Sequence, residues 1–209
     1  MKTTPRERRQ ERTRQAIIHS ALRLIREKGP NELSLREVAR RIDYSPAGLY
    51  EYFDSKEDLI QAVCAEADDR LRAALESVDP ALEAGEYLVE LGLAYIRFAR
   101  QQPEHFTFLF TRLESETPVE APEAFEIDPH SSFMILYNAV QKAIQTGVLG
   151  TGEGFGIVEI SYSLWSLVHG MAMLQTQSLD GFPIEFDRTD REALKRFLRG
   201  LGRGKAQER

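Results

Sequence analysis

Apolar residues recur about every 3.6 positions along most of this chain, which is the spacing of an amphipathic helix. A first helix extends from an Arg-rich run, and Gly29 with Pro30 ends it. The apolar face of this helix consists of Ile17, Ala21, Leu22, Leu24 and Ile25. No segment shows the alternation that is typical of a strand. The sequence therefore predicts an all-helical fold.

A short helix comes next. Ser34 is its expected cap, and Glu37 three residues later completes the pattern of a capping box. One apolar face of this helix comprises Leu35, Val38, Ala39 and Ile42. The helix is therefore expected to span about two turns.

A second short helix begins after an interruption at Asp43 and Tyr44. Ser45 is its expected cap, and Pro46 takes the first helical position, where its missing N–H costs nothing. We expect this helix to run to about Phe53. A long helix, two short helices and a tight turn between them match a helix-turn-helix, in which the second short helix enters the major groove of DNA.

The remaining helices follow from the same period. Ser55 and Asp58 resemble a further capping box, which opens a long helix toward Leu75 that Pro80 ends. Residues 114–129 are rich in Glu and Pro and are expected to form a surface loop. Further helices are expected over residues 87–98, 106–110, 133–144, 155–177 and 187–201.

Charge is distributed unevenly along the 209 residues. Residues 1–56 hold 13 Lys and Arg against 8 Asp and Glu, a net charge of +5, whereas the rest of the chain carries −11. A basic segment attracts DNA phosphates and an acidic remainder is repelled by them, although many basic segments are only solvated faces. This distribution favours DNA binding by the N-terminal part of the chain.

The composition argues against several other classes. The lone Cys64 forms no internal disulfide, no apolar run approaches the length of a membrane span, and the Arg-rich start lacks the apolar stretch of a signal peptide. We therefore expect a cytoplasmic protein. The histidines are scattered, and no nucleotide-binding loop, nucleophile motif or metal-spaced cluster is present, so we expect neither an enzyme nor a cofactor or metal.

Residues 34–59, SLREVARRIDYSPAGLYEYFDSKEDL, resemble the DNA-binding signature of the TetR family of repressors. The positions that carry the resemblance are Ala39, Ser45, Leu49, Tyr50, Tyr52, Phe53, Ser55, Lys56 and Glu57. The resemblance implies that the second short helix binds DNA and that Lys56, like the lysine at the matching position in the family, contacts a phosphate.

The candidate DNA contacts lie on both short helices and the turn. Gly48 costs about 1 kcal/mol in a helix relative to Ala, and close approach of the helix backbone to DNA would explain it. Tyr hydroxyls and the Ser45 hydroxyl suit phosphates, while Arg36 and Tyr44 reach either the backbone or a base. The full set is Ser34, Arg36, Tyr44, Ser45, Ala47, Gly48, Tyr50, Tyr52 and Lys56. Packing in the core is the alternative for Tyr50 and the stronger expectation for Leu49 and Phe53.

Some residues of this region are ambiguous for DNA binding. Asp43 stands where family members usually have Gly, at a turn position that favours the left-handed conformation, which Asp tolerates better than most residues. Glu51 either repels phosphate or accepts from a cytosine amino group. The arginines between positions 6 and 14 either reach DNA or pair with Glu7 and Glu11 along the helix, and they are left out of the site.

Residues 165–174, WSLVHGMAML, are similar to the WHG-type ligand-binding domain of some TetR-family proteins. Trp165 and His169 share a helix face, and Gly170 allows a neighbouring helix to approach closely. The candidate ligand site consists of Tyr95, Phe98, Phe106, Phe110, Tyr137, Trp165, His169 and Met173. Such a lining favours a hydrophobic or amphipathic molecule, although aromatic residues at helical spacing also simply fill a core.

The resemblance also implies a homodimer formed by the last two helices and a palindromic DNA operator. The two recognition helices would then occupy successive major grooves, about 34 to 36 Å apart. A small-molecule effector that changes this separation would lower operator affinity, so we expect a repressor relieved by its ligand. The alternatives are an activator and a helical sensor that has lost DNA binding, which Asp43, Glu51 and Asp54 make conceivable.

Overall fold

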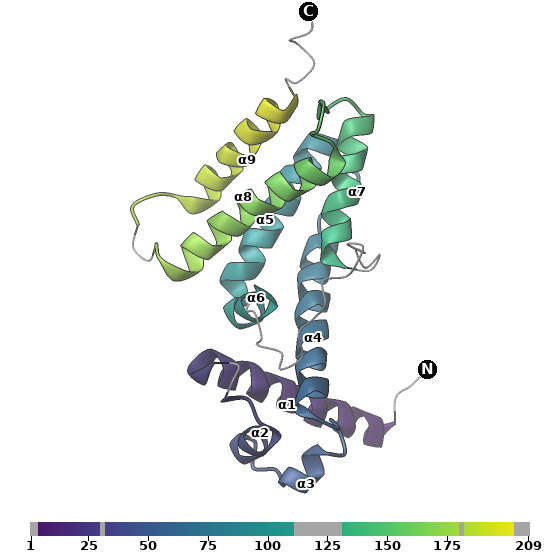
Figure 1. Ribbon diagram of the computed structural model, residues 1–209, viewed down its shortest axis with the longest axis vertical. Coiled ribbons are helices and arrows are strands. Elements are labelled where there is room, and N and C mark those ends of the chain that lie inside the picture. Colours follow the sequence, from purple (N-terminus) through teal and green to yellow (C-terminus); the bar gives the residue numbers. More distant parts are fainter. Residues whose placement is uncertain (1–3, 30–31, 111–130, 180–181, 203–209) are drawn as a thin grey trace, which may run out of the picture. The chain divides into compact units, whose positions relative to one another are not determined.

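The computed structural model describes residues 4–29, 32–110, 131–179 and 182–202. Over these ranges the regular structure is helical, apart from one isolated bridge between Gly152 and Phe155, so the all-helical prediction is confirmed. The expected loop over residues 114–129 lies outside the described residues. The helices in Figure 1 are α1 (Pro5–Lys28), α2 (Leu35–Arg41), α3 (Pro46–Leu49), α4 (Lys56–Glu76), α5 (Ala84–Gln101), α6 (Pro103–Phe110), α7 (Ser132–Gln145), α8 (Ile157–Gln177) and α9 (Phe186–Gly202).

The helices group into two compact units. The first contains α1, α2, α3, the beginning of α4 and nearly all of α6. The second contains the end of α4 together with α5, α7, α8 and α9. The division along α4 falls between Asp68 and Asp69.

A buried apolar cluster holds the first unit together. It joins the inner face of α1 to α2, α3 and the start of α4, and Phe108 of α6 belongs to it. Leu49 and Phe53 are 0% and 2% exposed, which confirms that they are core residues. Burial of each such side chain stabilises the fold by about 1.5–3 kcal/mol. The guanidinium of Arg14 lies 5.3 Å from the centre of the Phe53 ring and covers it.

Side-chain caps set where α3 and α4 begin. The Ser45 hydroxyl accepts a hydrogen bond from the amide of Gly48 at 3.0 Å, and the Ser55 hydroxyl accepts from the amide of Asp58 at 3.1 Å. Each cap satisfies an amide that has no partner inside its own helix. The helix starts expected at Ser45 and Ser55 are therefore confirmed.

Two details of this region differ from the sequence-based prediction. Helix α3 ends at Leu49 rather than Phe53, because the amides of Glu51 and Tyr52 bond carbonyls three residues back, which tightens the chain and turns Phe53 into the core. The capping box of α2 is half formed. Ser34 caps the helix, but the Glu37 carboxylate binds a guanidinium instead of returning to the cap.

Asp43 adopts the left-handed conformation that its position in the turn predicts. Its φ is 52°, and it is the only described residue other than glycine with a positive φ. The amide of Tyr44 then bonds the carbonyl of Ala39 at 3.0 Å. The chain therefore turns sharply within a few residues of the end of α2.

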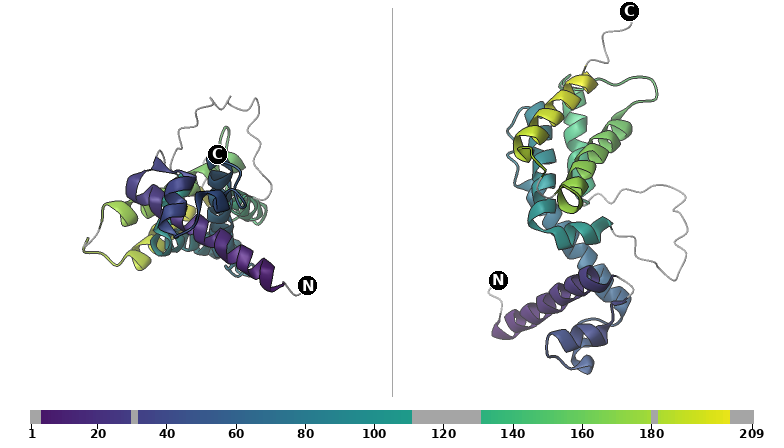
Figure 2. Two further views of the ribbon diagram at one scale, coloured as in Figure 1. Left: turned by 90° about the horizontal axis from the view of Figure 1, so that it is seen from below. Right: turned by 90° about the vertical axis from the view of Figure 1, so that its left-hand side faces the viewer.

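Helix α5 contacts α7, α8 and α9 in the second unit, which Figure 2 shows from two further sides. Gly92 marks a close approach of three helices, because a Cβ there would lie 2.9 Å from Leu194 of α9 and 3.1 Å from Val168 of α8. Arg191 of α9 adds ion pairs to two glutamates of α5, at 2.8 and 2.5 Å. Packing and charge thus both fix α9 against α5.

Helix α8 is more apolar than we expected from the sequence. Among the described residues it is the one helix long and apolar enough to cross a membrane, with a mean hydropathy of 1.3 over its most apolar stretch. The expectation that no segment approaches this length was wrong, because Glu159 is the only charged residue of α8. Only 28% of that stretch is buried, although α8 packs on α5 and α7. An apolar face of α8 therefore stays exposed in the single chain.

Candidate DNA interface and ligand site

The surface of the helix-turn-helix carries most of the predicted DNA contacts. Tyr50 is 55% exposed and Tyr44 is 37% exposed, so Tyr50 does not pack in the core. Gly48, Tyr52 and Lys56 are half-buried. The remaining candidates are all exposed: Ser34, Arg36, Ser45 and Ala47.

Tyr44 and Gly48 fit closely together. A Cβ on Gly48 would lie 2.6 Å from Cε1 of Tyr44, well inside the distance at which carbon atoms pack. The Tyr44 ring also meets the Tyr52 ring edge-on, with ring centres 6.3 Å apart. A side-chain hydrogen bond with Tyr52 raises the pKa of Tyr44, so Tyr44 keeps its phenol proton. The packing of the protein itself therefore accounts for Gly48, which the sequence alone had related to DNA.

The two candidate serines serve as helix caps and also offer donors to DNA. The Ser34 oxygen accepts from the amide of Glu37 at 3.2 Å, and the Ser45 oxygen accepts from the amide of Gly48 at 3.0 Å. A hydroxyl that accepts in this way still has its hydrogen to donate. Both serines are exposed, so their hydroxyls suit phosphate oxygens.

Charge on α2 is divided between its two sides. Glu37 binds Arg40 at 2.7 Å and Lys28 at 3.4 Å, and the Arg40 guanidinium lowers the pKa of Glu37 to about 2. Arg36 forms no ion pair with any residue in the described part of the chain. Arg36 is therefore the guanidinium of α2 that remains available to DNA.

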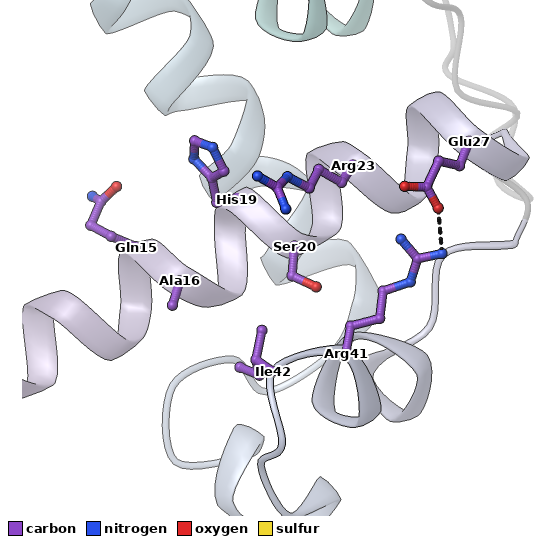
Figure 3. Close-up of a pocket in the computed structure, with 8 residues that line it drawn as sticks. All are labelled: Gln15, Ala16, His19, Ser20, Arg23, Glu27, Arg41 and Ile42. Atoms are coloured by element: carbon purple, nitrogen blue, oxygen red, sulfur yellow. Dashed lines mark hydrogen bonds and ion pairs between the residues drawn. The ribbon is translucent and has the colours of Figure 1, made fainter.

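A hollow of about 580 Å³ lies between α1 and the end of α2, as Figure 3 shows. Arg41 lines it and is bound by Glu27 at 2.7 Å, while Glu37 lies 3.5 Å from the Arg41 Nε. Ala16 and Ser20 line the wall formed by α1. Because two carboxylates already neutralise Arg41, we assign no ligand to this hollow.

Three residues of the candidate ligand site form a hydrogen-bonded chain in the second unit. Trp165 Nε1 donates to the Tyr95 hydroxyl at 3.3 Å, and that hydroxyl lies 2.9 Å from His169 Nδ1. All three groups are satisfied when Tyr95 accepts from Trp165 and donates to a neutral imidazole that carries its proton on Nε2. Burial lowers the pKa of His169 and raises the pKa of Tyr95, which favours this protonation state.

The other candidate ligand residues differ in burial. Phe98 is 2% exposed and lies in the core of the second unit, whereas Tyr137 and Met173 are half-buried. Phe106 and Phe110 lie in the first unit, with their ring centres 5.1 Å apart. Of the eight candidates, hydrogen bonds join Tyr95, Trp165 and His169.

Phe133 is a member of this cluster that sequence reasoning missed. Its ring meets the Trp165 ring edge-on, with ring centres 6.0 Å apart. The sequence marks Phe133 only as one of the apolar positions of α7. Helical spacing identifies the apolar face of a helix, but it does not say which residue of another helix that face meets.

A helix-turn-helix unit followed by a larger helical unit defines a class, the DNA-binding transcription regulators. Residues 17–63 match the bacterial regulatory proteins of the tetR family, and residues 88–201 match the tetracyclin repressor-like C-terminal domain. The second match alone spans more than half of the chain. The chain therefore belongs to the TetR family: it is a transcription regulator and not an enzyme.

Individual relatives agree with this assignment. The HTH-type transcriptional regulator UidR of Escherichia coli is 31% identical over 78 residues, 37% of this chain and 40% of the relative. The match thus spans about two fifths of the length of UidR. An uncharacterized HTH-type transcriptional regulator of Mycobacterium tuberculosis is 23% identical over 168 residues, 78% of this chain and 70% of the relative.

Solved structures share the fold over most of the chain. A protein with unknown function from Rhodococcus sp. has a TM-score of 0.71 at 26% identity, over 90% of this chain and 95% of that chain. The TetR family transcriptional regulator PfmR of Thermus thermophilus has a TM-score of 0.66 at 21% identity, over 88% and 98%. The likeness to PfmR concerns the fold alone.

The contact between Gly48 and Tyr44 predicts that the effect of Gly48→Ala on the free energy of unfolding changes sign when Tyr44 is removed. Gly48→Ala should lower the free energy of unfolding by about 1 kcal/mol, because the added methyl displaces the Tyr44 ring. In a Tyr44→Ala background the same substitution should raise it by about 0.5–1 kcal/mol, the ordinary helix preference for Ala over Gly. Urea denaturation followed by circular dichroism measures both values. Equal effects in the two backgrounds would show that the methyl does not meet Tyr44.

The half-buried, neutral His169 predicts a pH dependence of stability. Because its pKa is lowered in the folded state, the unfolded chain binds a proton there that the folded chain does not. The stability difference between the parent protein and His169→Gln should therefore shrink as the pH falls below about 6.5, the ordinary pKa of histidine. Urea denaturation across that range measures it, and the remaining histidines cancel in the difference. A difference that grows toward low pH would contradict the neutral assignment.

Proposed function

We propose that the chain is a homodimeric repressor of a palindromic operator, acting in the cytoplasm and released by a small, mostly hydrophobic ligand. The observation that carries the proposal is a helix-turn-helix whose core buries Leu49 and Phe53 while Arg36, Tyr44 and Tyr50 stay exposed. A rigid core beneath exposed donors suits a surface that reads DNA. Residues 1–60 form the proposed DNA-binding domain and residues 61–209 the ligand-binding and dimerisation domain.

In the proposed complex α3 lies in the major groove. Its small residues Ala47 and Gly48 allow the helix backbone close to the bases, while Arg36 and Tyr44 contact a base edge or the backbone. The remaining groups bind phosphate through hydroxyls or positive charge. These are Ser34, Ser45, Tyr50, Tyr52 and Lys56.

In the second domain the proposed ligand lies against the hydrogen-bonded chain of Tyr95, Trp165 and His169. The rings of Trp165 and Phe133 supply apolar area, and the imidazole supplies a polar group, a combination that favours a hydrophobic or amphipathic molecule. The resemblance to the WHG type supports this position. Within the second unit the proposed lining also includes Phe98, Tyr137 and Met173.

The exposed face of α8 supports a dimer. Val158, Tyr162 and Leu174 are 55%, 63% and 51% exposed, and Ser166 and Gly170 lie between them at steps of four residues. An added Cβ at Gly170 would meet no atom within 4 Å, so the chain itself does not use the space beside it. Isolated soluble proteins rarely expose such an apolar stripe, and a second copy of α8 would cover it. Helix α9, which packs on α5 beside α8, completes the proposed four-helix interface.

Operator binding is tested with Tyr50→Phe, which removes only a hydroxyl. The affinity of this variant for DNA from the region upstream of the protein's own gene should fall about tenfold. The variant loses the hydrogen bond from the Tyr50 hydroxyl to a phosphate, and a hydrogen bond to a charged group contributes about 1.5 kcal/mol or more. Fluorescence anisotropy measures the affinity, and Tyr87→Phe in the second unit is the matched control. An unchanged affinity would remove Tyr50 from the interface, and absence of any saturable complex with DNA would favour the sensor that no longer reads DNA.

Repression by the protein, and its release from DNA by a ligand, are tested with the same protein–DNA complex. A reporter fused to the bound region should be expressed more strongly in cells that lack the protein. A fatty acid or aromatic compound that dissociates the complex should also change the fluorescence of Trp165, which is the only tryptophan of the chain. Dissociation without any change at Trp165 would place the ligand elsewhere.

The dimer is tested with Leu174→Glu. A glutamate in the proposed interface would be buried without a partner, so the dimer dissociation constant should rise at least about tenfold. Sedimentation over a range of protein concentrations measures this constant. Val148→Glu is the control, since it changes an exposed apolar residue that lies off the α8 face. Equal dimerisation of both variants would refute the proposed interface.

A further inference from the structure

One end of α1 extends beyond the core of the helix-turn-helix. No residue from Pro5 to Ala16 is buried, and Ile17 is the first buried residue of α1. At 1.5 Å per residue, residues 5–16 form about 18 Å of helix that precedes the buried part of α1. We refer to residues 5–16 as the α1 arm. Figures 1 and 2 show the arm projecting past α4, toward the end of the first unit where α3 lies.

The arm is basic at a place where helix electrostatics disfavours cations. The amino end of a helix carries a partial positive charge, so arginines in its first turns destabilise it. Residues 5–12 are all exposed, so no packing there compensates for that cost. The arm nevertheless carries five arginines against two glutamates, namely Arg6, Arg8, Arg9, Arg12 and Arg14 against Glu7 and Glu11. Arg14 covers the Phe53 ring, but the exposed Arg6 and Arg9 do not benefit the helix and point to a partner outside the chain.

The carboxylates of both glutamates in the arm accept hydrogen bonds from uncharged groups. Glu7 forms a complete capping box with Thr4, in which the Glu7 carboxylate accepts from the Thr4 amide at 2.7 Å. Glu11 accepts a hydrogen bond from Gln15 at 3.0 Å. The sequence left open that the arginines simply pair with these glutamates. The side chains of Arg6 and Arg9 have no such ion pair to any residue that the structure describes.

Arg6 and Arg9 lie on a particular side of α1. Steps of three and four residues lead from them through Thr13 to Ala16 and Ser20, so these residues share one face of the helix. In the adjoining part of α1, Figure 3 shows Ala16 and Ser20 directed toward the end of α2. The two arginines therefore share the side of α1 that faces the helix-turn-helix.

Two arginines of the second unit provide a comparison. Arg97 and Arg100 both lie on α5 and are exposed. Each already pairs with a carboxylate, Arg97 with Glu90 and Arg100 with Asp187. They supply an equal charge on the unit that does not contain the helix-turn-helix.

We propose that the α1 arm is a second DNA-contact element, in which Arg6 and Arg9 bind backbone phosphates beside the bases that α3 reads. The proposal rests on the proposed function, since it assumes that the helix-turn-helix binds DNA. Guanidinium groups bind phosphate through paired, charge-assisted hydrogen bonds, and such contacts add affinity without reading sequence. The arm therefore strengthens binding to operator and to unrelated DNA by a similar factor.

The test compares Arg6→Gln/Arg9→Gln with Arg97→Gln/Arg100→Gln, which removes the same charge from the second unit. Each protein is titrated into the upstream duplex and an unrelated duplex at several KCl concentrations. The slope of log affinity against log salt should become shallower by about 3.6 in the first variant, since the proposed dimer has two arms with two phosphate contacts each and each contact contributes about 0.9. The control should keep the parent slope. Arg6→Lys/Arg9→Lys, which retains the charge, should keep it too.

The outcomes separate this proposal from the proposed function. An unchanged slope in Arg6→Gln/Arg9→Gln, or an equal loss in the control, would overturn the arm as a contact element, while the result for Tyr50→Phe would leave operator binding in place. A parent protein that forms no saturable, salt-dependent complex with either duplex would overturn both. Circular dichroism establishes that the variants retain their helices.

Discussion

The backbone at Asp43 adopts a φ of 52°, and the geometry of the DNA-binding surface depends on that conformation. The left-handed residue lets the Tyr44 amide bond the carbonyl of Ala39, so the chain turns sharply between α2 and α3. The Tyr44 ring then lies against Gly48, where a methyl group would not fit without movement. With the turn fixed in this way, Leu49 enters the core and Tyr50 stays outside.

Charge in the first unit is divided between neutralised and available cations. Arg40, Arg41 and Lys28 form ion pairs with Glu37 or Glu27, so their charges are neutralised within the protein. Arg36 and the arginines at the start of α1 lie outside this network. Because the attraction of DNA depends on phosphate contacts more than on total charge, a chain of net charge −6 remains suited to bind it.

Helix α8 has a different role on each of its faces. Trp165 and His169 join the hydrogen-bonded cluster with Tyr95 of α5, while Tyr162 and Leu174 face solvent in the single chain. In the proposed dimer, one rigid helix therefore contacts both the ligand and the second copy. A ligand that shifts α8 against α5 would change how the two copies pack, which is the difference in contacts that coupling between two sites requires.

The sequence by itself determined the helices, the left-handed turn at Asp43, the caps at Ser45 and Ser55 and the core positions Leu49 and Phe53, because these depend on spacing and local hydrogen bonds. It also determined the family, through a motif confined to consecutive residues. Only the tertiary structure decided the contacts between segments far apart in sequence. Such contacts include the fit of Gly48 to Tyr44, the hydrogen-bonded chain from Trp165 through Tyr95 to His169, and the packing of Phe133 on Trp165. The exposure of the apolar stripe on α8 was likewise decided by the tertiary structure. Helical spacing states which face of a helix is apolar, but the neighbour of that face depends on how the helices pack.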